Sequence, residues 1–152
     1  RLADIADQAL VPFAEAKSSL AKAMASDNPW ERYWGCITAA VHGQSAKALV
    51  PNAEKLLHDE NLMVRMRAAE FLGSIKAADP MPALLSVLNS VTTEQELMLT
   101  FNAVVYLRDY KGYKFDNSKL DLKFKGGEIV RRTSYLEGNP RRPSKKKPKK
   151  KK

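Results

Sequence analysis

The sequence predicts an all-α protein: a short α-solenoid of helix pairs, followed by an irregular or hairpin-like C-terminal arm and a disordered lysine-rich tail. Three observations lead to this fold class. Apolar residues recur at helical spacing over most of residues 1–107, short polar turns interrupt them, and similar residues return at a constant offset, the one that separates Asn28 from Asn61. We therefore expect a helical repeat domain over 1–107, a partly extended arm over 108–140 and the tail over 141–152.

Residues 2–25 have the apolar spacing of one or two helices, with Pro12 near the middle. Because proline lacks a backbone donor and clashes with the preceding turn, Pro12 should break or bend this segment. Asn28 and Pro29 are a typical helix start, since asparagine caps the first turn and proline suits the first helical position. A second helix is therefore predicted over 29–41, ended by Gly43.

Four further helices follow, separated by polar turns. They are expected over 46–58, over 62–75, from Asp79-Pro80 onward, and from the capping residues 92–94 to about Leu107. Gly73 and the following Lys76 are expected to stop the second of these four. Each predicted helix has a length that is ordinary for a globular protein.

Positions at this constant offset resemble one another, which indicates a repeat. The matches join Asn28 to Asn61, Arg32 to Arg65, Val64 to Leu97 and Ala68 to Phe101. One helix pair cannot bury its own apolar faces, so neighbouring pairs must stack into a solenoid. A plain antiparallel bundle is the alternative, but its helices need not be alike at a fixed offset.

The pattern changes after Leu107. Leu120, Leu122 and Phe124 alternate with polar residues, which is the period of a strand. Gly126-Gly127 could turn this strand back through residues 129–130 to form a hairpin. The alternative is an extended arm that packs along the last repeat. A lone hairpin is only marginally stable, so a hairpin or an extended arm must pack against the helices.

The net charge of +9 lies in the tail. The rest of the chain carries equal numbers of basic and acidic side chains, and residues 1–107 hold 9 basic and 12 acidic ones. The tail can bind any polyanion by counterion release, or it can act as a solvated solubilising segment. Its basic residues are Arg141, Arg142, Lys145, Lys146, Lys147, Lys149, Lys150, Lys151 and Lys152.

The residues most often used in chemistry form no predicted site. Cys36 lies in an apolar helical run and is expected to be a buried thiol. His42 and His58 are isolated at helix ends, where solvation or the helix dipole accounts for them better than a metal does. We assign no catalytic, cofactor-binding or metal-binding residue to this chain.

Charged and aromatic residues within the helices are interpreted as structural. The acid pairs Asp59-Glu60 and Glu94/Glu96 lie at helix starts, where negative charge interacts favourably with the helix dipole. Arg32 and Arg65 recur at the repeat period. We expect each to reach an acid of the next repeat, such as Asp27, Asp59 or Glu60, rather than to form a ladder of positive groups on one surface. The three aromatic residues Trp30, Tyr33 and Trp34 share one helical face; we expect them in the core rather than as a carbohydrate platform.

The stretch from Asp59 to Gly73 resembles the first helix of a HEAT repeat: an Asp, a short spacer, Val64-Arg65, two small residues and Leu72-Gly73. Residues 27–35 resemble it more loosely, with Glu31 where an apolar residue is usual. This pattern occurs in many unrelated proteins, so the resemblance implies an α-solenoid and no particular activity.

Residues 12–108 also resemble the C-terminal region that follows the catalytic domain in some bacterial sulfatases. The similar segments are 27–29 with 32–35, 64–65 with 68–70, and 102–103 with 106–107. This resemblance implies an exported, calcium-dependent, arylsulfatase-like parent, with a periplasmic or extracellular location. Its formylglycine motif is missing here, because Cys36 is followed by Ile37, Thr38 and Ala39.

Two function hypotheses follow. The first is a non-catalytic helical module of a sulfatase-like hydrolase, packed on an upstream catalytic domain missing from this chain, since the chain opens with Arg1 and is expected to be a fragment or a processed form. The alternative is a stand-alone HEAT-type module that binds another protein and uses the tail for polyanions. A third reading, nucleic-acid binding, relies on the tail alone. No run of apolar residues is long enough for a transmembrane helix.

Overall fold

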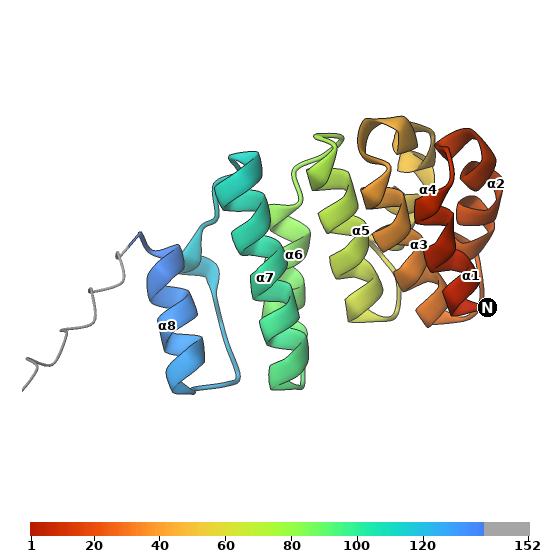
Figure 1. Cartoon of the computed structure of the whole chain (residues 1–152). Coiled ribbons are helices and arrows are strands. Elements are labelled where there is room, and N and C mark those ends of the chain that lie inside the picture. Colours follow the sequence, from red (N-terminus) through yellow and green to blue (C-terminus); the bar gives the residue numbers. More distant parts are fainter. Residues whose placement is uncertain (139–152) are drawn as a thin grey trace, which may run out of the picture.

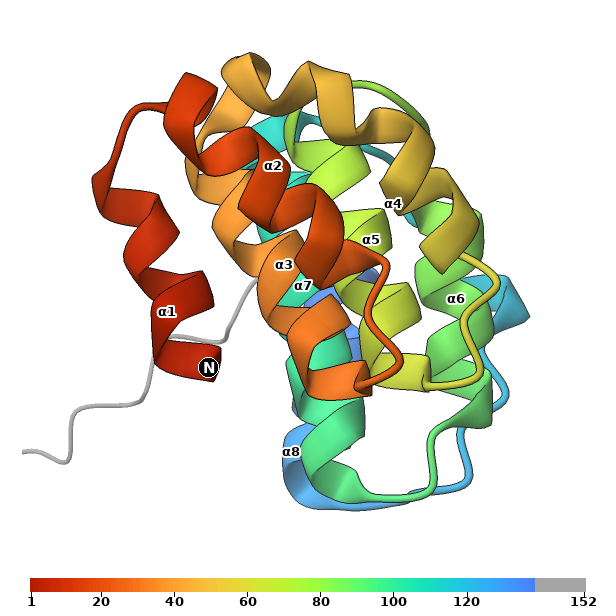
Figure 2. The same ribbon diagram turned by 90° about the vertical axis from the view of Figure 1, so that its right-hand side faces the viewer.

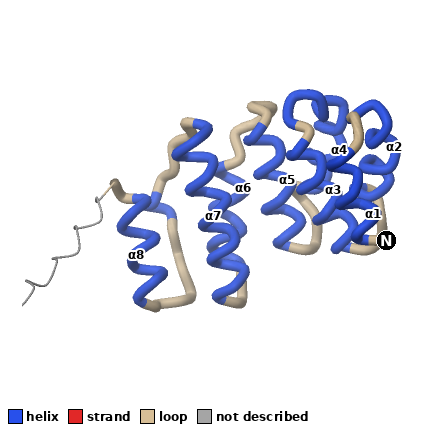
Figure 3. Tube along the Cα trace, in the orientation of Figure 1, coloured by secondary structure: helices blue, strands red, loops and turns tan. Residues whose placement is uncertain are grey.

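The computed structural model describes residues 1–138, and all regular elements in that range are helical (Figure 3). The α-helices are α1 (Leu2–Asp7), α2 (Phe13–Met24), α3 (Pro29–Val41), α4 (Val50–Leu56), α5 (Leu62–Ser74), α6 (Met81–Ser90), α7 (Glu94–Lys111) and α8 (Gly127–Leu136); the short 3-10 helices are η1 (Gln8–Leu10), η2 (Gly43–Leu49) and η3 (Asn117–Lys119). The all-α prediction is confirmed. The predicted tail, 141–152, lies outside the described residues.

The helices form two layers of a short solenoid (Figures 1 and 2). The front layer consists of α1, α3, α5, α7 and α8, each packed beside the next. The back layer consists of α2, α4 and α6, and the extended segment 112–126 continues it beside α6 (Figure 2). The outward surface of the front layer is called the front face below.

Equivalent side-chain caps start three of the front-layer helices, α3, α5 and α7, as the repeat predicts. The Asn28 side-chain oxygen accepts a hydrogen bond from the Trp30 amide at 2.9 Å, and the Asn61 oxygen accepts one from the Met63 amide at 2.9 Å. Thr93 does the same for α7 through the Glu96 amide at 3.2 Å. Such a cap satisfies a backbone donor that has no partner within the helix.

Helix α5 lies at the centre of the core. Its residues Val64, Ala68, Phe71 and Leu72 pack with α2, α3 and α4, while Met66 and Ala69 pack with α6 and α7. Most of the α5 surface is apolar and is covered by these helices, and the side that carries Arg67, Glu70 and Ser74 is left to the front face. This explains why the two halves of the core meet at α5.

Gly73 was predicted to stop its helix but does not, because α5 continues through Ser74. Lys76, the other predicted stop, lies just beyond the helix end and has a φ of 58°. A Cβ atom at Gly73 would lie 2.5 Å from Cγ of Pro80 and 3.0 Å from Cδ2 of Leu107. Gly73 therefore permits close packing of α5 against its neighbours. Gly43, by contrast, ends α3 with a φ of 55°, which glycine adopts at little cost.

The predicted hairpin is wrong for residues 127–136, which form α8. The extended alternative is correct for the preceding segment: Tyr113, Phe115, Leu120, Leu122 and Phe124 pack against the core, and Lys114, Asp121 and Lys123, which alternate with them, are exposed. The alternation therefore reports one buried side of an extended chain, although no strand partner pairs with it in the described residues. Helix α7 continues to Lys111, beyond the predicted end at Leu107, and the first residues of the predicted helix 46–58 are the 3-10 helix η2.

Candidate functional site

The front-layer helices differ in composition from the rest of the described chain. They hold both tryptophans, four of the five tyrosines and six of the seven arginines of residues 1–138, but one lysine, Lys111, of ten. The back layer, the turns and the extended segment hold the other nine lysines. Arg32 is buried, but the other five arginines, both tryptophans and the four tyrosines reach the surface at least in part. Aromatic residues and arginine are enriched in protein–protein interfaces and lysine is depleted, so this composition favours an interface on the front face.

A groove of about 300 Å³ runs over the front face across α3, α5 and α7. Val41, whose residue surface is 63% exposed, stands at the end of α3 and contributes to the apolar wall. The lining residues are Ile37, Ala40, Val41, Arg67, Glu70, Ser74 and Tyr106. The groove is thus apolar on its α3 side and polar on its α5 side.

Arg67 is held firmly in the wall of this groove. Its guanidinium lies 2.5 Å from the Glu70 carboxylate and donates a hydrogen bond to the Tyr33 hydroxyl at 2.8 Å. Burial lowers the pKa of Arg67, but the neighbouring Glu70 and Tyr33 outweigh it and the net pKa is raised. The side chain therefore stays charged and has one fixed orientation, as a preorganised binding group requires.

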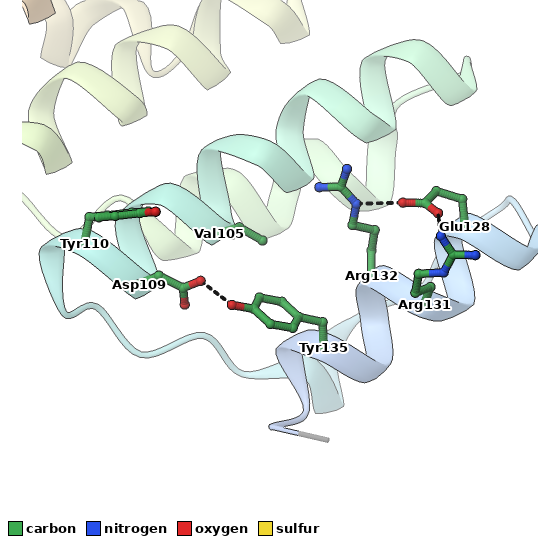
Figure 4. A pocket seen from close by; sticks show the side chains of 7 residues that line it. All are labelled: Val105, Asp109, Tyr110, Glu128, Arg131, Arg132 and Tyr135. Atoms are coloured by element: carbon green, nitrogen blue, oxygen red, sulfur yellow. Dashed lines mark hydrogen bonds and ion pairs between the residues drawn. The ribbon is translucent and has the colours of Figure 1, made fainter. Parts of the chain in front are cut away.

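A second groove, of about 480 Å³, separates α7 from α8 (Figure 4). Its lining residues are Val105, Asp109, Tyr110, Glu128, Arg131, Arg132 and Tyr135. On one side, the Tyr135 hydroxyl donates to Asp109 at 2.6 Å. On the other, Glu128 accepts from Arg131 at 2.8 Å and from Arg132 at 3.1 Å. The two arginines share this single carboxylate in the described residues.

The Asp109–Tyr135 contact is strengthened by Arg108. This side chain binds Asp109 at 2.7 Å, donates to the Tyr135 carbonyl oxygen at 3.1 Å and lies 4.6 Å from the centre of the Tyr135 ring. Burial raises the pKa of Asp109, but the hydrogen bonds from Tyr135 and Arg108 outweigh it and lower the net value. The same bond to Asp109 raises the pKa of Tyr135. Asp109 is therefore ionised, and it ties α8 to α7.

The predicted role of Arg32 is confirmed. It forms a two-point ion pair with Asp59 of the next repeat, at 2.6 and 2.9 Å. Arg65 instead donates to the backbone oxygen of Asp59. At the repeat offset the position equivalent to Asp59 is Thr92, so this position of the next repeat offers Arg65 no acid. Of the two repeated arginines, Arg32 therefore pairs with an acid of the next repeat, and Arg65 does not.

The prediction that all three aromatic residues of α3 are core residues is wrong. Trp30 is 56% exposed, and Tyr33 and Trp34 are half-buried. Helix α3 buries its opposite face, formed by Arg32, Gly35, Cys36 and Ala39. A Cβ atom at Gly35 would lie 2.9 Å from Cγ of Met24, so α2 comes too close for large side chains there. The aromatic face must turn outward, toward the front face.

The remaining candidates have structural surroundings. Cys36 is fully buried, and burial raises the pKa of its thiol to about 12. The His42 ring nitrogen lies 2.9 Å from the Gln8 carbonyl oxygen, and His58 is exposed. Asp59 accepts from Arg32 and the Asn61 amide, and Glu96 accepts from the Thr92 amide. Within residues 1–138, no three His, Cys, Asp or Glu side chains gather closely enough to hold a metal ion.

Sequence reasoning missed the residues of α7 and α8 that line both grooves. Tyr106 and Tyr110 lie one helical turn apart, outside the buried stripe of α7, and their ring centres are 6.0 Å apart. Arg131 and Arg132 fell in a segment interpreted as a hairpin or an extended arm. A count of tyrosine and arginine by helix would have shown that α7 and α8 differ from α6, which has neither.

The two helical layers and the lysine-poor front face define a helical repeat protein of the kind that binds other proteins. The family of HEAT repeats matches residues 15–95, which is more than half of the chain. The chain belongs to the HEAT repeat family. No curated protein and no solved structure matches it. Among the described helices, none combines the length and the apolar character needed to cross a membrane.

Proposed function

We propose that the chain is a non-catalytic interaction module whose front face binds a partner protein. The observation that carries this proposal is the contrast in composition between the two layers: tryptophan, tyrosine and arginine gather in the front-layer helices, and lysine is almost confined to the rest. Lysine loses much side-chain entropy on burial in an interface, whereas tyrosine and tryptophan supply large contact area from few rotatable bonds.

Exposed apolar side chains also favour the front face as the binding surface. Trp30, Val41, Leu99, Tyr106 and Tyr110 are all exposed and all belong to α3 or α7. The groove across α3, α5 and α7 lies among them and offers Arg67 as a fixed polar group. Interfaces depend on a few aromatic or arginine anchors surrounded by residues that exclude water.

The experiment compares two variants that place an aspartate at an exposed apolar position. Val41→Asp alters the front-face groove, whereas Leu10→Asp alters η1, outside the groove. Partners retained from the native source by the unchanged chain should be lost with Val41→Asp and kept with Leu10→Asp. Circular dichroism checks that both variants fold. Equal retention by both variants would show that the front face is not the binding surface.

A finer version is that the partner is an upstream catalytic domain of a sulfatase-like hydrolase on the same polypeptide. It is supported by the resemblance of residues 12–108 and by the Arg32-Tyr33-Trp34 segment, whose half-buried aromatic rings could pack on such a domain. Calcium would belong to that domain and not to this chain. Sequencing the gene upstream of the Arg1 codon tests the idea, which fails if no formylglycine motif lies within the length of two domains.

The tail is proposed to bind polyanions, since it carries nine basic residues and no acid over 141–152. Deletion of these residues should abolish salt-dependent binding to both heparin and DNA. Persistent DNA binding by the shortened chain at physiological salt would move that activity to the helices.

A further inference from the structure

We infer that the groove between α7 and α8 binds an acidic, partly apolar segment of a partner protein. This inference rests on the proposed function, that the front face binds protein, and it adds a second contact site with its own chemistry. The groove lies between two front-layer helices at the C-terminal end of the solenoid (Figures 1 and 4).

The charges that line the groove balance, and a third guanidinium outside the lining adds one positive charge beside it. Its arginines, together with Arg108 behind Tyr135, give three guanidinium groups against the two carboxylates Asp109 and Glu128. Glu128 serves both Arg131 and Arg132, and the Arg131 side chain is 66% exposed. A guanidinium has five donors in a fixed fork, so Arg131 can bind an additional carboxylate without losing Glu128.

Arg132 and Tyr135 are already oriented by contacts within the protein. Arg132 donates to Asn102 at 2.6 Å as well as to Glu128, which anchors it to α7 across the groove. The Tyr135 ring is fixed between Arg108 and its hydrogen bond to Asp109. Binding to fixed side chains costs less conformational entropy than ordering free ones.

The groove also offers apolar surface. Tyr110 is 79% exposed although its ring is large, and it lies beside Tyr106 and lines the groove with Val105. Tyr110 lies at one end of the groove and Arg131 at the other (Figure 4), which suits an extended segment in which acidic residues flank a leucine or a phenylalanine. The apolar residue would cover Tyr110, and an acid further along the segment would reach Arg131.

Charge along the chain would guide such a segment to this end of the molecule. Residues 1–107 carry a net charge of −3, residues 108–140 carry +3, and residues 141–152 carry +9. A field of this sign attracts acidic ligands and accelerates their association. A nucleic-acid backbone fits the groove less well, because its closely spaced phosphates would lie against Asp109 and Glu128.

The test measures binding of a fluorescein-labelled peptide in which pairs of glutamate flank Leu and Phe, by fluorescence anisotropy with the full chain at physiological salt. Arg131→Gln should weaken binding roughly tenfold, the loss typical of a charged hydrogen bond. Lys55→Gln removes the same charge from an exposed position on α4 and should leave binding unchanged within about twofold. Tyr110→Ala should weaken binding of the peptide that contains Leu and Phe more than binding of a peptide with glycine in their place.

Two outcomes would overturn the inference. Equal losses with Arg131→Gln and Lys55→Gln would mean that overall charge, including the tail, binds the peptide. An oligothymidylate of the same net charge that binds as tightly and loses as much with Arg131→Gln would make the groove a phosphate site. Neither outcome affects the proposed function, which is tested separately by Val41→Asp, outside this groove.

Discussion

Arg32 and Asp59 join two successive repeats through a pair of parallel hydrogen bonds, at 2.6 and 2.9 Å. Both side chains are largely buried, with 11% and 6% of their surface exposed. Arg32 also donates to the carbonyl oxygens of Ser26 and Asp27, at 2.8 and 2.9 Å. The guanidinium therefore closes the turn before α3 and fixes its position relative to the start of α5.

Removal of either partner of this pair should destabilise the protein strongly. Arg32→Met leaves the buried Asp59 carboxylate without its main partner. Asp59→Asn leaves the buried Arg32 charge without a carboxylate to pair with. Each variant should lower the free energy of unfolding by about 3 kcal/mol. Glu60→Gln is the control, since Glu60 is exposed and lies 3.9 Å from Arg32, and it should cost less than about 0.5 kcal/mol. Urea denaturation measures all three. Losses below about 1 kcal/mol for both buried partners would contradict this account.

Gly73 allows α5 to approach Pro80 and α7, so Gly73→Ala should destabilise the protein by about 2 kcal/mol or more. The added methyl group would lie 2.5 Å from Cγ of the Pro80 ring, which cannot move aside easily. Gly127→Ala is the matched control, because nothing lies within 4 Å of the new Cβ and the residue starts α8. It should be neutral or slightly stabilising. Thermal unfolding distinguishes the two, and a similar melting temperature for both variants would refute the packing argument.

Trp30 should contribute little to stability despite its size. Trp30→Ala is expected to cost less than about 1 kcal/mol, because the side chain is mostly exposed, whereas Phe71→Ala should cost about 3 to 5 kcal/mol. The two tryptophans also differ in exposure, so acrylamide should quench Trp30 fluorescence in a Trp34→Phe variant more than Trp34 fluorescence in a Trp30→Phe variant. Equal quenching would place Trp30 in the core after all.

The sequence allowed the helices to be predicted where capping residues and apolar spacing agree. Asn28 with Pro29 and Gly43 bound α3 closely, and the recurrence of Arg32 as Arg65 at the repeat period led to the contact with Asp59. Both are local or periodic signals. Pairing across repeats could be predicted because the constant offset brings equivalent turns together.

The orientation of α3 could not be predicted in the same way. Its aromatic side and its small-residue side both have helical spacing, and burial of the small side depends on how closely α2 approaches Gly35. Helix α8 was missed for a related reason. Gly126-Gly127 resembles a turn, and of its residues only Ile129 and Leu136 are buried, which is too few for a clear helical period. The groove between α7 and α8 was missed with it.

Cys36 makes stability depend on alkaline pH in a direction set by its raised thiol pKa. In the folded chain the pKa is about 12, whereas the unfolded thiol titrates near its ordinary value of 9.0. Above pH 9 the unfolded state loses a proton that the folded state keeps, so the thiol's contribution is full below pH 9 and is lost as the pH rises toward 12. Between about pH 8 and 10 the difference in unfolding free energy between the unchanged chain and Cys36→Ala should shrink by about 1.4 kcal/mol. The variant lacks the thiol but retains every other titrating group, so it isolates this effect. Urea denaturation at both pH values measures it, and a constant difference would mean that the Cys36 thiol titrates in the folded protein as it does in the unfolded one.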